Sequence, residues 1–333
     1  MTSFTESFKV HNMSQDATEN VNPSFSLPEE EKLALLKIFP NGIIALDLET
    51  TGLSPLCDRI IELSAVKLKP EGMTFFDRLI NPQIPISEIT IKIHGITDEM
   101  VKNSPAVSEV LPDFVTFMED LPLIGHNAKF DIGFIVFNMH HLNIIPKNNR
   151  VLCSCQISRA IFKAMPNHKL GTLAEKLGIA LRHHEAFDDA CASLRLFAKA
   201  ILAVENHPSE WAPALKESSL FLLSDFIKNE DWELPERLKI LGECVGEQKI
   251  IEMLYSGGTH KGIFRPVRPI GLLPMPSGSV LYGHCLLSNT YKSFSLNKIR
   301  NVRLPSINDQ HKWQETYELF KERDKARQLL NQV

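Results

Sequence analysis

Two acidic side chains, Asp47 and Glu49, end the apolar run in NGIIALDLETTGL at residues 41–53. Side chains alternate along a β-strand, so this spacing predicts that both carboxylates lie on one face of a strand. Like charges so close together repel each other unless they are protonated or neutralised. A divalent cation that prefers hard oxygen ligands is the simplest neutraliser, so the pair predicts a metal site.

A D-x-E pair alone is more often a pair of exposed polar residues, but two further patterns favour the metal interpretation. In GHNAKFD, Asp131 enters a helix directly after a buried strand, where open α/β sheets present ligands. A lone acid there is otherwise explained by the helix dipole. In HHEAFDDA, a histidine precedes an aspartate by five residues, which leaves two candidate pairs, His183 with Asp188 and His184 with Asp189.

Short apolar or alternating runs predict the strands that position these acids. The predicted strands cover 42–49, 59–68, 73–80, 121–126 and 150–155. Helical spacing predicts helices at 108–119, 127–141, 155–165, 172–177 and 186–204. Strands followed by alternating strands and helices predict an α/β fold, with a mixed sheet flanked by helices.

Composition bounds the class of protein. The chain has 333 residues, 44% hydrophobic and 23% charged, which indicates a globular protein with room for two domains. No apolar run approaches the ~18 residues that span a bilayer, and the first thirty residues do not resemble a signal peptide, so we expect a cytoplasmic protein without membrane contact. The six cysteines form no C-x-x-C pair, which argues against a disulfide framework or a structural zinc site.

Charge is unevenly distributed along the chain. Residues 247–303 hold eight Lys or Arg and two Glu, while 304–333 are balanced, so the net charge of −4 leaves −10 for residues 1–246. The basic segment suggests contact with an anionic partner, and the acidic segment that precedes it suggests bound cations. A solvated charged surface is the common alternative for both.

The motifs occur together in the order found in one enzyme family. They are D-x-E-T-T-G at 47–52, D-R-I-I-E-L at 58–63, I-H-G-I-T at 93–97, G-H-N-A-x-F-D at 125–131, L-G-T-L-A at 170–174 and H-x-A-x-x-D-A at 184–190. Over about 40–204 the sequence resembles a DEDDh-type (DnaQ-like) 3′→5′ exonuclease, the family of the proofreading subunit of bacterial replicative DNA polymerase. The last motif selects His184 and Asp189, because only this pair has Ala186 and Ala190 in the required places.

The resemblance implies a ribonuclease H-like fold and hydrolysis assisted by two metal ions, Mg²⁺ with Mn²⁺ as a substitute. One ion lowers the pKa of a bound water while the other supports the leaving 3′ oxygen. It assigns as metal ligands Asp47, Glu49, Asp131 and Asp189, with His184 as general base. It places near the terminal nucleotide the backbone of Thr50, Thr51 and Gly52 and the side chains of His94, His126 and Asn127; for His94 and His126 a structural role is an equal alternative.

The basic segment resembles a WYL domain, a small Sm-like β-barrel of bacterial regulators. The resemblance depends on VRP at 267–269, the apolar strand 280–287 and KSFSLNKI at 292–299, whereas the Trp-Tyr-Leu triplet is absent. Its aromatic residues Tyr255, Tyr282, Tyr291 and Phe294 are either stacking faces for bases or core. A nucleic-acid patch is predicted from Arg265, Arg268, Lys292, Lys298 and Arg300.

These predictions define the organisation and function that we expect. The expected segments are a flexible tail (1–35), the exonuclease domain (36–205), a helical connector (206–246), the WYL-like β module (247–305) and a C-terminal helix (306–333). We expect release of nucleoside monophosphates from single-stranded DNA 3′ ends in repair or proofreading, with association with a DNA polymerase or repair protein left open. The alternatives are RNA 3′-end trimming, since no motif separates the sugars, and a non-catalytic nucleic-acid or nucleotide sensor.

Overall fold

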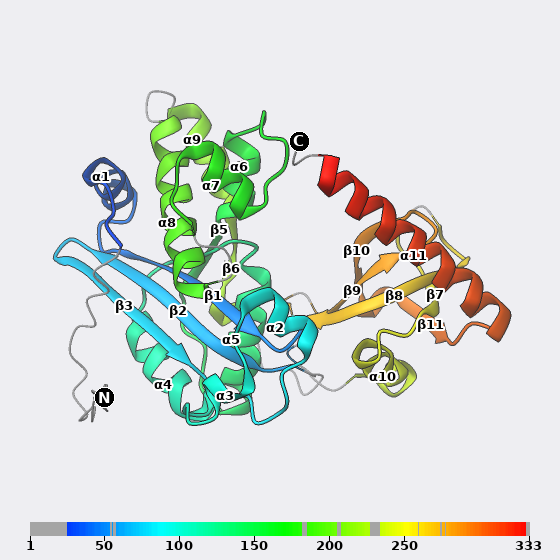
Figure 1. Cartoon of the computed structure of the whole chain (residues 1–333). Helices are drawn as coiled ribbons and strands as arrows, with labels where there is room; N and C mark the ends of the chain where they lie inside the picture. The colour runs from blue at the N-terminus through cyan, green and yellow to red at the C-terminus, as the bar shows by residue number, and fades with distance from the viewer. Residues whose placement is uncertain are drawn as a thin grey trace, which may run out of the picture.

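The computed structural model describes residues 25–53, 55, 58–181, 185–204, 208–226, 234–258, 260–273, 275–276 and 278–330. Its larger part is built on a six-stranded sheet of order β3-β2-β1-β4-β5-β6 (Figure 1). The strands are β1 (Ile43–Thr50), β2 (Ile60–Lys69), β3 (Gly72–Leu79), β4 (Leu123–Gly125), β5 (Arg150–Cys153) and β6 (Ser219–Leu222). Strands β1, β4 and β5 are parallel to one another and the others pair antiparallel, which confirms the predicted mixed sheet.

Helices cover both faces of this sheet, as predicted. They are α1 (Glu29–Ile38), α2 (Glu88–His94), α3 (Asp98–Val101), α4 (Val107–Met118), α5 (Lys129–His141), α6 (Ser154–Ile161), α7 (Leu170–Leu177), α8 (Ala186–Ala203) and α9 (Pro208–Ser218). Helices α4 and α5 pack on one face, and α1, α6, α8 and α9 pack on the other. Each face of the sheet buries its own apolar cluster, so the sheet separates two hydrophobic cores.

Alternation along β1 decides which face carries the acids. Ile44, Leu46 and Leu48 are buried against α4 and α5. Ile43 and Ala45 are buried on the opposite face, against α1 and α8. Because the side-chain period of a strand is two, Asp47 and Glu49 continue this second face, and they lie on the side of the sheet that α8 covers.

Two segments differ from the sequence-based predictions. Helix α1 begins inside the predicted tail and is held by the buried Glu31, whose carboxylate accepts from Arg195 Nε and Nη2 on α8 at 2.9 Å each. The pattern of charged residues concealed this anchor, because its partner is 164 positions away in sequence. Within the predicted helical connector, β6 pairs with β5 and extends the sheet.

The C-terminal part is a five-stranded antiparallel sheet of order β10-β9-β8-β7-β11. Its strands are β7 (Ile251–Tyr255), β8 (Phe264–Leu273), β9 (Val280–Cys285), β10 (Thr290–Ser295) and β11 (Ile299–Arg303). The short helices are η1 (Leu223–Asp225), η3 (Glu236–Leu238), α10 (Ile240–Gly246) and η4 (Leu296–Lys298). The predicted β module is therefore present, but pairing leaves β10 and β11 at opposite edges and does not confirm a closed barrel.

The chain's last described element is α11 (Ile307–Leu330), the predicted terminal helix, which lies along the C-terminal sheet (Figure 1). Its Tyr317 is buried with Ile250 and Leu286, and Trp313 packs beside them. Among the residues that the structure describes, none of the helices combines the length and the apolar character needed to cross a membrane.

Candidate active site

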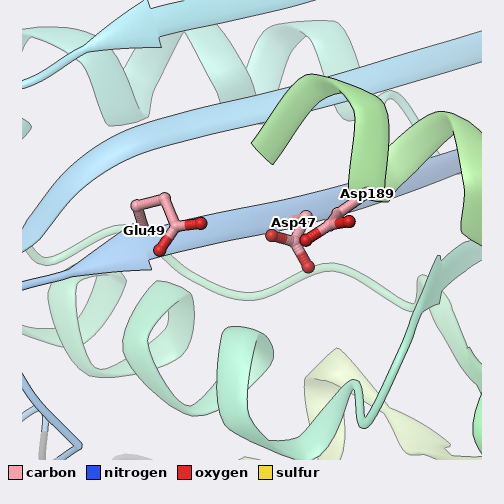
Figure 2. Close-up of side chains that lie close together, drawn as sticks. All are labelled: Asp47, Glu49 and Asp189. Atoms are coloured by element: carbon pink, nitrogen blue, oxygen red, sulfur yellow. The ribbon is translucent and has the colours of Figure 1, made fainter. Parts of the chain in front are cut away.

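Three carboxylates meet where β1 passes beneath the first turn of α8. Oxygens of Asp47, Glu49 and Asp189 all lie within 4.8 Å of one another, and Figure 2 shows the three side chains gathered around one space. The strand supplies two of them through its alternation. Asp189 comes from α8, where an acid in the first turn is favoured by the positive end of the helix dipole.

Crowding and burial make these acids difficult to ionise. Burial raises the pKa of Asp47 well above its usual value, and the neighbouring charges of Asp131 and Asp189 raise it further. Burial, followed by the charge of Glu62, raises the pKa of Glu49 from 4.5 to about 8. Raised pKa values of this kind are typical of carboxylates that are arranged to share positive charge.

Asp131 lies beside this cluster rather than within its closest group. It is buried, with 3% of its surface exposed, at the start of α5. Burial raises its pKa to about 8, while hydrogen bonds from backbone groups, including that of Leu48, act in the opposite direction. Its charge is the largest carboxylate contribution to the raised pKa of Asp47, so the four predicted ligands occupy one electrostatic site.

A fifth acid, Glu62 on β2, belongs to the same environment, and sequence reasoning gave it no role. Burial and the charge of Asp77 raise its pKa to about 7, while a hydrogen bond with the backbone of Ala186 lowers it. Ala186 is the first residue of α8, so Glu62 links the sheet to the helix that presents Asp189. The D-R-I-I-E-L motif and the antiparallel register with β1 are the signals that identify it.

The side chains of two threonines stabilise the turn after β1 through hydrogen bonds. Thr50 Oγ1 donates to the carbonyl of Gly52 at 2.6 Å, and the backbone N–H of Arg59 donates to Thr51 Oγ1 at 3.0 Å. A β-carbon on Gly52 would lie 2.4 Å from the carboxyl group of Asp58, so a side chain at position 52 would require that carboxyl group to move. These contacts fix the backbone that was predicted to meet the terminal nucleotide; that contact remains a prediction.

His126 is bound on both ring nitrogens by the protein itself. Nε2 lies 2.9 Å from the carbonyl of His168 and therefore donates, while Nδ1 lies 2.8 Å from Ser154 Oγ. Burial lowers the pKa of His126 to about 4, so the ring is neutral. This geometry favours the structural alternative for His126 over contact with substrate.

The other predicted substrate-side residues differ in exposure. His94 is buried at the end of α2, and its Nδ1 accepts the backbone N–H of Ile96 at 3.0 Å. Asn127 is exposed with a left-handed φ of 66°, and its carbonyl accepts the N–H of Phe130 at the start of α5. The predicted general base, His184, and its neighbour His183 lie outside the described residues.

The basic residues of the C-terminal sheet do not form the single patch that was predicted. Arg265 is only 3% exposed; it donates to the carbonyl of His260 at 2.9 Å, and its guanidinium lies 5.4 Å from the ring centroid of Tyr255. It is thus part of the core. Lys292 and Arg300 lie on β10 and β11, the opposite edge strands.

Arg268 and the aromatic residues complete this correction. The Arg268 guanidinium lies 4.0 Å from the ring centroid of Tyr317 and donates to Gln248, so α11 and the turn before β7 hold it. The rings of Tyr255 and Phe294 meet edge to face at 5.2 Å within the core of the sheet. Lys298 and Arg300 are exposed, and their contact with nucleic acid stays a prediction.

The donor set fits a hard divalent cation. The ligands of this cluster are carboxylate oxygens, which Mg²⁺ and Mn²⁺ prefer, and among the described residues no sulfur or nitrogen ligand accompanies them. The oxygens of Asp47, Glu49 and Asp189 lie within 4.8 Å of one another, so these three residues would hold such a cation together. Bound positive charge would also relieve the repulsion that raises the pKa values of these acids.

A comparison with protein families matches the same part of the chain. Residues 44–197 match the family described as RNase_T, Exonuclease. These residues form an exonuclease domain. They contain every acid of the candidate active site, from β1 to α8.

Curated relatives of the exonuclease domain are named DNA polymerase III PolC-type. The protein of Caldanaerobacter subterraneus subsp. tengcongensis is 42% identical over 158 residues, covering 47% of this chain and 11% of the relative. That of Bacillus cereus is 38% identical over 177 residues, covering 53% of this chain and 12% of the relative. The chain therefore spans about a tenth of the length of these relatives.

Solved structures were also matched. One is described as exonuclease X in complex with 5′ overhanging duplex DNA, with a TM-score of 0.39 and 21% identity, covering 52% of this chain and 99% of that chain. Another is the nuclease domain of 3′hExo, a DEDDh family member, bound to rAMP, with a TM-score of 0.42 and 21% identity, covering 49% of this chain and 92% of that chain.

Proposed function

We propose that this protein is a metal-dependent 3′→5′ exonuclease that releases nucleoside monophosphates from single-stranded DNA ends. The observation that carries the proposal is the convergence of Asp47, Glu49 and Asp189 within a segment of the exonuclease family. Phosphodiester hydrolysis is extremely slow without a catalyst, so a site must both activate water and stabilise charge on the leaving oxygen.

Each predicted ligand has a place in this chemistry. Asp47, Glu49, Asp131 and Asp189 would hold two divalent cations, and these ions would supply an activated water and charge stabilisation at the leaving 3′ oxygen. His184 would accept the proton of that water, because a histidine with a pKa near 6.5 is largely neutral at pH 7. Mg²⁺ is the proposed ion, with Mn²⁺ as a substitute.

DNA is the proposed substrate because the curated relatives are named DNA polymerases. We place the activity in proofreading or repair in the bacterial cytoplasm, where a DNA polymerase is a candidate partner. RNA trimming is the second outcome of the test below, since the metals and the base act on a phosphate that both polymers share.

The experiment offers 5′-end-labelled single-stranded DNA, the matching RNA and blunt duplex DNA to the full chain with Mg²⁺, Mn²⁺ or EDTA. We expect a ladder of progressively shorter labelled products from single-stranded DNA with either metal, and none in EDTA or with Asp47→Asn. If RNA were shortened faster than single-stranded DNA, RNA would replace DNA as the proposed substrate. Immediate release of a labelled mononucleotide, or equal rates for Asp47→Asn, would contradict the proposed mechanism.

A further inference from the structure

The C-terminal sheet touches the exonuclease domain close to the metal ligands. A β-carbon on Gly271 of β8 would lie 2.5 Å from the carbonyl oxygen of Leu53, which follows Glu49 by four residues. Strand β8 reaches toward the exonuclease domain in Figure 1, and its glycine permits this close backbone approach. The two parts of the chain are thus in contact beside the candidate active site.

A cavity of about 350 Å³ lies at this contact and is lined from both sides. The exonuclease domain contributes Leu53, Asn127, Lys129 and Phe130. The C-terminal part contributes Met275, which lies between β8 and β9, and Tyr282 of β9, among others. Phe130 directly precedes Asp131, so one wall is made by the same segments that carry the metal ligands. The volume falls within the range of about 300–1,000 Å³ that holds small organic groups.

The lining has the chemistry of a nucleotide site. Phe130 and Tyr282 offer aromatic faces and Met275 a polarisable thioether, which suit the planar surface of a base. Lys129 and Asn127 are exposed at the start of α5 and offer a cation and an amide, which suit a phosphate and a base edge. A purely structural contact between two domains would not need this combination of aromatic, thioether, amide and cationic groups.

We propose that Tyr282 of β9 and Met275, between β8 and β9, complete a nucleobase pocket beside the metal site, so that the C-terminal part of the chain belongs to the substrate site. The occupant is an unpaired base near the 3′ end of the bound strand. A base stacked and paired in a duplex cannot enter a cavity closed on two sides, so the pocket selects single-stranded ends. This inference rests on the proposed function, because it deepens the substrate preference of that site.

The test measures binding of a fluorescein-labelled single-stranded octanucleotide by anisotropy. The full chain carries Glu49→Gln in every sample, which removes hydrolysis. Adding Tyr282→Ala should weaken binding about 5- to 100-fold, the range that loss of one base–aromatic stack produces. Tyr282→Phe keeps the ring and should bind like the parent. Gly271→Ala, whose β-carbon meets Leu53, should also weaken binding.

Two controls separate stacking from folding and from non-specific effects. Phe264→Ala removes a half-buried ring of the same sheet that does not line the cavity, and it should leave affinity within about twofold. An octanucleotide whose last two sugars carry no base should bind more weakly to the parent, and Tyr282→Ala should cause no further loss.

The outcomes distinguish this inference from the proposed function. The nucleobase pocket would be overturned if Tyr282→Ala and Gly271→Ala both left the affinity unchanged. It would also be overturned if Tyr282→Ala weakened binding of the abasic strand as much as binding of the normal strand. Hydrolysis by the unsubstituted protein would still support the exonuclease in either case. Sensitivity to Tyr282→Ala in a chain whose unsubstituted form hydrolyses nothing would support the pocket and contradict the exonuclease.

Discussion

Glu49 on β1 lies directly opposite Glu62 on β2 in the antiparallel register of the sheet. Residues in this relation point to the same face, so two carboxylates are neighbours under the start of α8. After burial, the charge of Glu62 is the largest cause of the raised pKa of Glu49. The pairing of β1 with β2 therefore holds two carboxylates that repel each other when ionised at the candidate metal site.

The metal-free protein should lose stability as pH rises. The folded-state pKa is raised from 4.5 to about 8 for Glu49 and to about 7 for Glu62, so between these limits the unfolded chain loses protons that the folded site retains. Unfolding is then favoured with increasing pH, by about 2 kcal/mol after allowance for solvent screening. Thermal unfolding in EDTA at pH 5 and pH 8 measures this, and excess Mg²⁺ should remove most of the difference. A higher midpoint at pH 8 than at pH 5 in EDTA would disagree with the prediction.

Glu49→Gln should stabilise the metal-free protein at pH 8 while abolishing hydrolysis. The amide removes one of the repelling charges, with an expected gain of about 1 kcal/mol in the free energy of unfolding. Urea unfolding in EDTA provides the measurement. Glu88→Gln, on the exposed start of α2, is the matched control and should change neither quantity. Loss of stability in Glu49→Gln would show that the carboxylate makes favourable contacts instead.

Adjacent aspartates on α8 should differ sharply in their contribution to catalysis. Asp189 belongs to the cluster with Asp47 and Glu49, and Asp188 does not. Asp189→Asn should lower kcat by about 100-fold or more, whereas Asp188→Asn should remain within a few-fold of wild type. Steady-state rates on a single-stranded oligonucleotide with saturating Mg²⁺ decide this. Equal losses in the two variants would remove the assignment of Asp189.

The neighbouring residues His183 and His184 should also differ in their contribution to catalysis. His184→Ala should lower kcat by about 100- to 10,000-fold, the usual contribution of a general base, and His183→Ala should have a small effect. Circular dichroism confirms that both variants fold. A larger loss in His183→Ala would assign the base to the other histidine of the HHEAFDDA motif.

The buried Glu31 should matter for stability and not for chemistry. Besides its two hydrogen bonds from Arg195, its carboxylate lies 3.4 Å from Lys199 Nζ. Glu31→Ala leaves the partly buried charges of Arg195 and Lys199 without their partner and should cost about 3 kcal/mol of unfolding free energy. Glu30→Ala, exposed on the same helix, should cost little. A loss of kcat per folded molecule in Glu31→Ala would mean that α1 positions the catalytic face of α8.

Much of the sheet and the position of its acids follow from local patterns. Alternation along 43–49 predicts that Asp47 and Glu49 share a face, and helical spacing after 186 predicts that Asp189 begins a helix. These properties depend on neighbouring residues only. The family motifs add the order of the elements, which local patterns do not supply.

Other features depend on contacts between residues far apart in sequence. The pairing of β6 with β5, the anchoring of Glu31 by Arg195 and the approach of Gly271 to Leu53 leave no local signal. Arg265 shows the same limitation, because its burial depends on carbonyl and aromatic partners that only the folded sheet brings together. Positive residues in a basic segment therefore do not by themselves define a binding surface.

Direct measurement of metal binding tests the central claim. We would titrate Mn²⁺ into the 333-residue chain at pH 7.5 and follow free Mn²⁺ by electron paramagnetic resonance, comparing the unsubstituted chain with Asp47→Asn. The structure predicts at least one ion bound per wild-type chain and a large loss of uptake in the variant. Absence of binding by wild type, or equal uptake by both proteins, would contradict the assignment of these carboxylates as a metal site.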